Sequence, residues 1–384
     1  MRFFHLSDLH IGKHLHHYNL KEDQRHILTE IVNYTKELRP DAVFIAGDIY
    51  DKSVPSAEAV EIFDEFLTEL SEIKPEIPVL IISGNHDSPE RLSYAGGILR
   101  KNKIYMSGSV PRSAQEHLKK VTFEDEFGEV EVYLLPFMKP SHVRNLFEEM
   151  PQTYTEAVSK VIEREKVNYK KRNVLISHQF YTHGGNGPET CESEMISVGG
   201  IDNVDISAIE RFDYVALGHI HGAQTAGTDH IRYCGTPLKY SVSEAGHEKS
   251  LIMVTLGEKG CSPEIQKFPL HPLYDVRKKT GTLAEIMKQA AENEGQDYVS
   301  ITLTDEVEPY RPKDQLENVY ARILEIRIDN TRTKNKLLDF DEVEISDNPF
   351  EAFAGFFEEM QGRKLNENER TYMREIFEQE GENV

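Results

Sequence analysis

Apolar residues occur in short runs along the first two-thirds of the chain, and most of these runs end in a group of polar residues. Continuous apolar runs of this length are typical of strands that are buried on both faces. The sequence therefore predicts six buried strands, in the segments RFFHLSD, DAVFIAGD, PVLIISGNHD, VYLLPF, NVLISHQ and YVALGHIH.

Helical periodicity separates the first three of these strands. One helix is expected from Asp23 to Leu38 and a second from Ser56 to Leu70. The second has a single apolar face, formed by Ile62, Phe63, Phe66, Leu67 and Leu70. Strands that alternate with helices in this way predict an α/β fold in which sheets pack against helices.

The pattern changes after about residue 270. Residues 283–291 are expected to form a helix, and residues 298–303 and 320–328 to form strands. These elements predict a small α+β module, which a charged stretch at 329–342 connects to the C-terminal segment.

The C-terminal segment predicts two short amphipathic helices. Asn348-Pro349 is typical of a helix start, and Gly362 separates the two helices. Such short helices cannot bury a whole aromatic stripe against each other. Two alternatives follow, docking onto the rest of the chain or binding a partner helix or coiled coil. The stripe consists of Phe350, Phe353, Phe356 or Phe357, Met360, Tyr372, Met373, Ile376 and Phe377.

The composition adds a constraint on partners. The chain has 384 residues and a formal charge of −22, which argues against strong unaided binding to nucleic acid. Residues 341–384 hold 13 acidic and 4 basic side chains, so the tail accounts for much of that charge. Divalent metal ions bound at a carboxylate-rich site would offset the remainder locally.

Targeting signals and cysteines point to one compartment. No secretory signal and no apolar run long enough for a membrane span are expected. The three cysteines are widely spaced and form no CxxC pair, which is typical of reduced thiols. We therefore expect a cytoplasmic protein.

Side chains able to bind metal follow several of the predicted strands. The ends of neighbouring strands meet at one rim of a sheet, where sites in α/β proteins lie. Asp8 and His10, two residues apart on an extended segment, should point to the same face, as should His219 and His221. The complete set is Asp8, His10, Asp48, Asn85, His86, Asp87, His178, His219 and His221.

The donor types and their number predict a metal site with two ions. A single histidine at a strand end is more often a structural residue, but the ordered series DxH, GD, GNHD, H, GHxH is far more specific. Oxygen and nitrogen donors without thiolate suit Mn²⁺, Fe²⁺ or Zn²⁺. The candidates are too many for one ion, and Asp48 can bridge two, which suits in-line attack on phosphorus. Gly47, Gly84 and Gly218 precede these polar residues, where the backbone must turn tightly.

Five histidines lie within the first 17 residues, and they do not form one cluster. His10 is the expected ligand, and His5 is expected to pack in the core. His14, His16 and His17 follow Gly12 and should lie in a loop near the rim of the site. There they either meet DNA or a partner chain, or remain solvated.

The ordered series resembles that of the calcineurin-like metallophosphoesterase superfamily. HLSDLHIGK, AGDIYDKSVPS, ISGNHDS, ALGHIHGAQ and RYCGTPLKYSVSE extend the resemblance to the SbcD family of nuclease subunits and to related double-strand-break-repair nucleases. The resemblance implies a four-layer α/β metallophosphoesterase sandwich flanked by helices, with a small α+β capping domain and a C-terminal helical segment. The implied domains are residues 1–270, 271–338 and 339–384.

The resemblance also implies a role for each site residue. Asp8, His10 and His221 would hold one metal ion and Asn85, His178 and His219 the second, with Asp48 bridging. His86 would contact the scissile phosphate and help to protonate the leaving oxygen, and Asp87 would orient His86. Archaeal members have a histidine where this chain has Asp51, so the role of that position stays open.

The activity and partners are likewise implied by the resemblance. The implied cofactors are two divalent ions, preferably Mn²⁺ with Mg²⁺ as the alternative. The implied activities are 3′-to-5′ exonuclease activity on duplex ends and endonuclease activity on single strands and hairpins. The partners would be DNA and an SbcC ATPase, in a heterotetramer with two chains of each kind. Lys13, His14, Arg91 and residues 169–172 are candidates for DNA contact or are solvated surface. The alternatives are a phosphodiesterase for small esters and a DNA-end scaffold.

Overall fold

The computed structural model describes residues 1–194, 202–290, 295–307, 309–330, 349–361 and 364–381. The chain forms two compact units, residues 1–302 with 311–327, and residues 303–310 with 328–384. The domain boundaries at 270 and 338 stay predictions. Position 338, most of the charged stretch at 329–342, Asn348 and Gly362 lie outside the described residues.

Two six-stranded sheets form the larger part of the first unit. The first sheet has the order β16 (Glu264–Pro269), β15 (Ser250–Thr255), β1 (Arg2–Leu6), β4 (Ala42–Ala46), β5 (Val79–Ile82) and β6 (Ile104–Ser107). The second has the order β13 (Gln224–Ala226), β14 (Thr228–Tyr233), β12 (Tyr214–Gly218), β9 (Arg172–His178), β8 (Gly128–Leu135) and β7 (Lys119–Asp125). Each sheet has four adjacent parallel strands, and two further strands join it by antiparallel pairing.

Alternating side chains of the central strands build two different cores. Phe3 of β1 and Phe44 of β4 stack between the sheets, with ring centroids 4.4 Å apart, and Tyr214 of β12 packs against Phe3. The intervening residues, such as Phe4 and Val43, face the helices instead. Because both faces are buried, these strands are continuously apolar in sequence.

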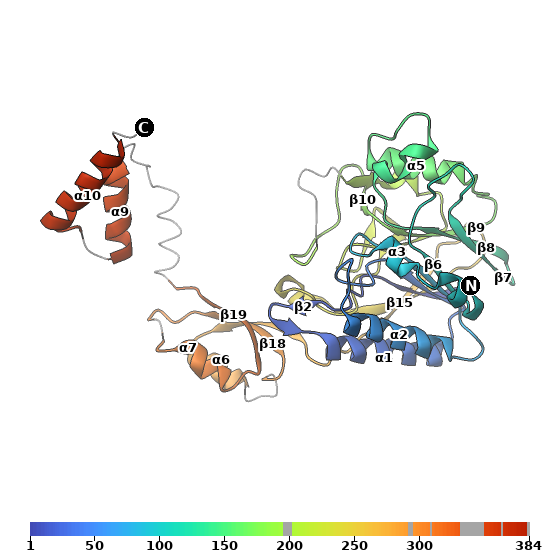
Figure 1. Cartoon of the computed structure of the whole chain (residues 1–384). Coiled ribbons are helices and arrows are strands. Elements are labelled where there is room, and N and C mark those ends of the chain that lie inside the picture. The colour runs from blue at the N-terminus through green and yellow to red at the C-terminus, as the bar shows by residue number, and fades with distance from the viewer. Residues whose placement is uncertain (195–201, 291–294, 308, 331–348, 362–363, 382–384) are drawn as a thin grey trace. The chain divides into compact units, whose positions relative to one another are not determined.

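Helices cover the outer faces of both sheets, which confirms the predicted four-layer sandwich (Figure 1). α1 (Lys21–Leu38) and α2 (Ala57–Ser71) pack on the first sheet and α5 (Tyr154–Arg164) on the second. Ser56 caps α2, accepting the Ala59 N–H at 3.2 Å, and the predicted apolar face of this helix is buried. Shorter helices are α3 (Pro89–Leu92) and α4 (Gly96–Leu99).

Several elements were not predicted, chiefly antiparallel strands at the sheet edges. β7 (KKVTFED) and β16 (EIQKFP) alternate between exposed and partly buried positions, so they contain no continuous apolar run. Two short strand pairs were also not predicted. They are β10 (Phe180–Thr182) with β11 (Asn203–Asp205), and β2 (His14–Leu15) with β3 (Tyr18–Asn19).

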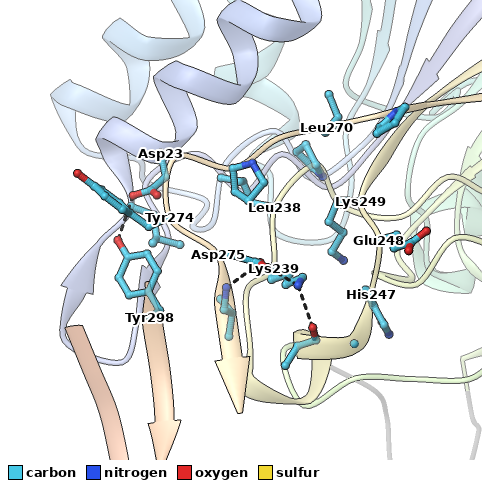
Figure 2. Close-up of a pocket in the computed structure, with 17 residues that line it drawn as sticks. Asp23, Leu238, Lys239, His247, Glu248, Lys249, Leu270, Tyr274, Asp275 and Tyr298 are labelled. Atoms are coloured by element: carbon cyan, nitrogen blue, oxygen red, sulfur yellow. Dashed lines mark hydrogen bonds and ion pairs between the residues drawn. The ribbon is translucent and has the colours of Figure 1, made fainter. Parts of the chain in front are cut away.

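The predicted α+β module is present. It has a three-stranded sheet, ordered β17 (Val276–Gly281), β18 (Tyr298–Leu303) and β19 (Arg322–Ile328), and the helices α6 (Leu283–Gln289) and α7 (Pro312–Glu317). Within the first unit, Tyr298 of the module donates to Asp23 of α1 at 3.0 Å, and Lys239 pairs with Asp275 at 2.8 Å. Figure 2 shows the cavity of about 470 Å³ that these residues line.

The two C-terminal helices, α9 (Pro349–Gln361) and α10 (Glu367–Gly381), lie side by side (Figure 1). Phe377 of α10 packs between Phe350 and Phe353 of α9, with ring centroids 6.3 and 5.8 Å apart. Phe356 and Tyr372 remain 60% and 65% exposed. The side chain of Met360 lies outside the described residues. As predicted, the helices bury only part of their aromatic stripe against each other.

In the part of the chain that the structure describes, no helix combines the length and the apolar character needed to cross a membrane.

Candidate metal centre

The carboxyl ends of five parallel strands meet at one edge of the sandwich. β1, β4 and β5 run parallel in the first sheet, as do β9 and β12 in the second. Gly218, at the end of β12, lies against the carbonyl of Ala46, at the end of β4, so the two sheets approach closely here. This edge brings together all the predicted site residues: Asp8, His10, Asp48, Asn85, His86, Asp87, His178, His219 and His221.

One group of donor side chains comes from both sheets. Asp8, His10 and His221 each offer a ligand atom within 4.8 Å of the others. The Nε2 atoms of His10 and His221 lie 3.2 Å apart, and Oδ2 of Asp48 lies 3.8 Å from His10 Nε2. This is the set that the resemblance assigned to the first ion.

A second group lies on the other side of Asp48. Asp48 Oδ2 is 3.3 Å from His178 Nε2. Asn85 Oδ1 is 3.0 Å from His178 Nε2 and 2.9 Å from His219 Nδ1. One oxygen of Asp48 therefore lies near histidines of both groups, the geometry expected of a bridging carboxylate.

Hydrogen-bond directions show that the second group suits a cation. His178 Nδ1 must donate to the carbonyl of Ala46, 2.7 Å away, because a carbonyl only accepts. As a metal ligand the ring is neutral, and Nε2 would then present a lone pair beside the oxygens of Asn85 and Asp48. Such a set of oxygen and nitrogen donors fits a divalent ion. His178, His219, Asn85 and Asp48 would hold it, while Cys234 lies beside Ser7 and contributes no thiolate.

Burial strengthens the electrostatics of the site. The side chains of Asp8 and Asp48 are almost completely buried. Burial raises the pKa of Asp8. Burial would raise the pKa of Asp48. The nearby His178 and His10 outweigh burial and hold that pKa well below its usual range. Burial likewise lowers the pKa of His178, yet the carboxylates of Asp48 and Asp8 outweigh it and raise that pKa to about 9.

The backbone at the site differs from the extended segment that was predicted. Asp8, His10, Asp48 and His219 have φ angles of 53°, 43°, 49° and 97°, in or near the left-handed region. Each such residue costs on the order of 1–3 kcal/mol, and such strain is concentrated at functional sites. The pairs in DLH and HIH do reach one site, but by sharp turns after the strand.

Close packing requires a glycine before Asp48 and before Asn85. A Cβ on Gly47 would lie 2.4 Å from His178 Nδ1, and one on Gly84 would lie 2.1 Å from Asp48 Oδ1. Gly47 also has a φ of 88°.

His86 lies beside the donor groups and is partly exposed, as is Asn85, whereas the aspartate and histidine donors are buried. Its backbone N–H donates to Asp48 Oδ1 at 2.8 Å, and its Nδ1 donates to the carbonyl of Asp51 at 2.8 Å. The prediction that Asp87 orients this ring is wrong. The Asp87 carboxylate accepts backbone N–H groups of Ile49, Tyr50 and Gly84 and so connects the two loops.

Asp51, whose role the sequence left open, has two contacts at the rim. Its carbonyl holds His86, and its carboxylate pairs with Lys13 at 2.9 Å. The side chain of Asp51 also lies 3.8 Å from His10 Nδ1.

Sequence reasoning missed three residues behind His221. The Ser193 hydroxyl lies 2.7 Å from His221 Nδ1 and 2.7 Å from Oε1 of Glu244. Glu194 accepts the backbone N–H of His221 at 2.6 Å. Glu244 is fully buried and ends the segment RYCGTPLKYSVSE, but nothing in that segment indicates contact with His221.

The other N-terminal histidines lie away from the donors. His5 is fully buried and bonded to the hydroxyl of Tyr214 at 2.9 Å, and burial lowers its pKa to about 3. His14 belongs to strand β2, and His16 and His17 lie in the turn between β2 and β3. The predicted loop is therefore a small hairpin.

Comparison with known proteins shows the family of the chain. The profile of calcineurin-like phosphoesterases matches residues 1–223, and that of the Type 5 capsule protein repressor C-terminal domain matches residues 269–361. The SbcD subunit of the nuclease SbcCD from Staphylococcus epidermidis is 31% identical over 329 residues, 84% of each chain. The chain belongs to the calcineurin-like phosphoesterases, in the SbcD family. This confirms the predicted family, fold class and general activity as a phosphodiester hydrolase, and it supports divalent metal ions as cofactors.

Two solved structures are more distantly similar. TT1561 of Thermus thermophilus is 14% identical with a TM-score of 0.41, covering 70% of this chain and 99% of that one. A dimetal phosphatase from Danio rerio is 11% identical with a TM-score of 0.36, again covering 70% and 99%. Likenesses this distant add no argument to the assignment.

Proposed function

We propose that this chain is the nuclease subunit of an SbcC–SbcD-type complex and hydrolyses DNA phosphodiester bonds with two divalent ions. Mn²⁺ is the preferred ion, with Mg²⁺ as the alternative. The observation that carries the proposal is the pair of donor groups that share Asp48 next to a partly exposed His86. The name of the Staphylococcus epidermidis relative, a nuclease subunit, supports a nucleic acid as the substrate.

The proposed ligands follow the two donor groups. Asp8, His10 and His221 would hold one ion and Asn85, His178 and His219 the other, with Asp48 between them. Ions bound there would polarise the phosphate and activate water for in-line attack.

The residues of the chain then hold and protonate the substrate. The Asp51 carbonyl fixes Nδ1 of His86. When the ring is protonated on both nitrogens, the Nε2–H of this imidazolium would give its proton to the 3′ oxygen as the bond to phosphorus breaks, which leaves His86 neutral. Lys13, held by Asp51 at the rim, is placed to meet a phosphate of the same strand.

The wider proposal concerns substrates and partners. The chain would act as a 3′-to-5′ exonuclease on duplex ends and as an endonuclease on single strands and hairpins, in DNA repair and recombination. It would form a homodimer within a heterotetramer with SbcC, in the cytoplasm at the nucleoid. Residues 271–338 would face DNA, and residues 339–384 would bind the SbcC coiled coil through the exposed aromatic residues of α9 and α10.

The test compares labelled duplex and hairpin DNA with a small chromogenic phosphodiester as substrates, in the presence of Mn²⁺. We expect the wild type to degrade both DNA substrates far faster than the small ester. Equal or better turnover of the small ester would instead favour a phosphodiesterase for small molecules. DNA bridging without cleavage would favour a scaffold.

A further inference from the structure

His221 is connected to a buried carboxylate through one hydroxyl. Ser193 lies between them, with its Oγ 2.7 Å from His221 Nδ1 and 2.7 Å from Glu244 Oε1. His221 Nδ1 and Glu244 Oε1 are 3.8 Å apart, too far for a direct hydrogen bond. The serine therefore completes a connection that the two side chains do not make alone.

The surroundings of Glu244 keep it ionised. The Lys249 ammonium lies 2.6 Å from Oε2, and both side chains are almost completely buried. The backbone N–H of Tyr240 donates to Oε1 at 3.1 Å, and the Ser241 hydroxyl lies 2.9 Å from the same oxygen. Figure 2 shows Lys249 at the wall of the cavity beside the α+β module. An ionised carboxylate can only accept hydrogen bonds.

The direction of each hydrogen bond follows from that restriction. The Ser193 hydroxyl has one proton, which it must donate to Glu244. Its oxygen is then the acceptor for His221, so the proton of the neutral ring lies on Nδ1. Nε2 of His221 is left with its lone pair and lies 3.2 Å from Nε2 of His10, on the side of the first donor group.

We propose that Glu244, acting through Ser193, is a positioning residue that sets the tautomer and ring orientation of His221 for metal binding. The inference deepens the proposed function and rests on its assignment of His221 as a ligand. Histidine ligands usually donate their second ring N–H to a fixed acceptor, and loss of such an acceptor typically weakens metal affinity by about 10- to 100-fold. His178 has the backbone carbonyl of Ala46 in this role, whereas His221 depends on side chains that can be substituted.

Backbone hydrogen bonds hold the segment that contains Ser193 next to His221. Glu194 accepts the backbone N–H of His221 at 2.6 Å, and the backbone N–H of Glu192 donates to Ser243 at 3.1 Å. These two bonds place Ser193 without help from its own hydroxyl. Removal of the hydroxyl should therefore leave the segment in place.

The test uses the full chain with three variants. Ser193→Ala removes the bridge, Ser193→Thr keeps a hydroxyl, and Cys191→Ala changes a neighbouring side chain as the matched control. The tautomer of His221 is read in the metal-free protein by ¹⁵N NMR of labelled histidines, assigned with a His221→Gln variant. Mn²⁺ affinity and stoichiometry are read by calorimetry.

We expect the Nδ1–H tautomer of His221 in the wild type and a mixture of tautomers in Ser193→Ala. One of two Mn²⁺ sites should weaken by about 10- to 100-fold in that variant. Ser193→Thr should restore most of the affinity, and Cys191→Ala should match the wild type. An unchanged tautomer and unchanged Mn²⁺ affinity in Ser193→Ala would overturn the inference.

Failure of the proposed function has a different signature. A wild type that binds no Mn²⁺ would contradict the metal centre itself. The metal-free NMR spectra would still decide whether the Ser193 hydroxyl sets the tautomer.

Discussion

The donor groups at the sheet edge and the helices α9 and α10 differ in how much of their surface is buried. In the first region, Asp8 and His178 are fully buried and Asp48 is 2% exposed. In the second, Phe356 and Tyr372 are 60% and 65% exposed although Phe350 is buried. The first region is held by contacts within its own unit, whereas the second leaves large apolar surfaces to water, as interaction sites do.

This difference separates two kinds of function. Chemistry on a phosphodiester needs ligand atoms fixed by the surrounding structure, which buried strands and their close-packed glycines supply. Binding to a partner needs apolar surface that is still accessible. Substitutions in the two regions should therefore affect activity and assembly separately.

The largest effect is expected for Asp48→Asn, because this carboxylate lies in both donor groups. Loss of charge stabilisation by both ions should lower DNA cleavage by about 10³- to 10⁴-fold. Cleavage of labelled duplex DNA in Mn²⁺ and calorimetric Mn²⁺ binding measure the effect. Asp41→Asn, at the start of β4 and far from its carboxyl end, is the control, and full activity in Asp48→Asn would refute the bridging role.

His86→Ala should reduce cleavage by about 10²- to 10³-fold while Mn²⁺ affinity stays near that of the wild type. The reason is that His86 lies beside the donors but is not among the proposed ligands. Steady-state kinetics and calorimetry separate the two properties. His117→Ala, an exposed histidine paired with Glu165, is the matched control. A large loss of Mn²⁺ affinity would make His86 a ligand instead.

A third substitution tests whether stability of the sandwich is separate from its site. Asp125 pairs with the buried Arg172 and with the N-terminal ammonium. Removal of the negative charge in Asp125→Asn should lower the free energy of unfolding by about 2–3 kcal/mol at neutral pH. Urea unfolding measures this, with Glu124→Gln on the same strand as the control.

The pH dependence of that effect follows from the same contacts. Arg172 and the N-terminus lower the pKa of Asp125 below its usual range. A lowered pKa in the folded state stabilises the protein above the unfolded pKa of about 4, and the contribution disappears as pH falls further. The difference between wild type and Asp125→Asn should therefore shrink below about pH 4. A difference that grows with acidity would contradict the ion pair.

The smallest effect concerns the exposed helices. Phe356→Ser or Tyr372→Ser should weaken binding to an SbcC coiled-coil fragment by about 30-fold each, the usual cost of losing an aromatic anchor. Nuclease activity of the isolated chain should not change. Glu358→Ala, on the polar surface of α9, serves as the control for binding by titration. Unchanged affinity in both variants would place the SbcC surface elsewhere.

The sequence predicted the central strands and the ligands because both have local signals. Buried parallel strands are continuously apolar, and their polar ends carry the DxH, GD, GNHD and GHxH motifs. Edge strands such as β7 and β16 were missed because one face is exposed, which removes the continuous run. The role of Asp87 was predicted wrongly, since adjacency to His86 in sequence does not reveal which backbone groups a carboxylate meets.

By itself, the residue pattern determined the α/β class, the strands that end in candidate ligands and the identity of the donors, while the four layers were implied by the family resemblance. The pattern depends on residue type and short spacing, which are readable locally. Only the tertiary structure decided that the carbonyl of Asp51 holds His86 and that Ser193 connects His221 to Glu244. Those contacts join residues distant in sequence, or use backbone atoms that every residue has, so packing alone selects them.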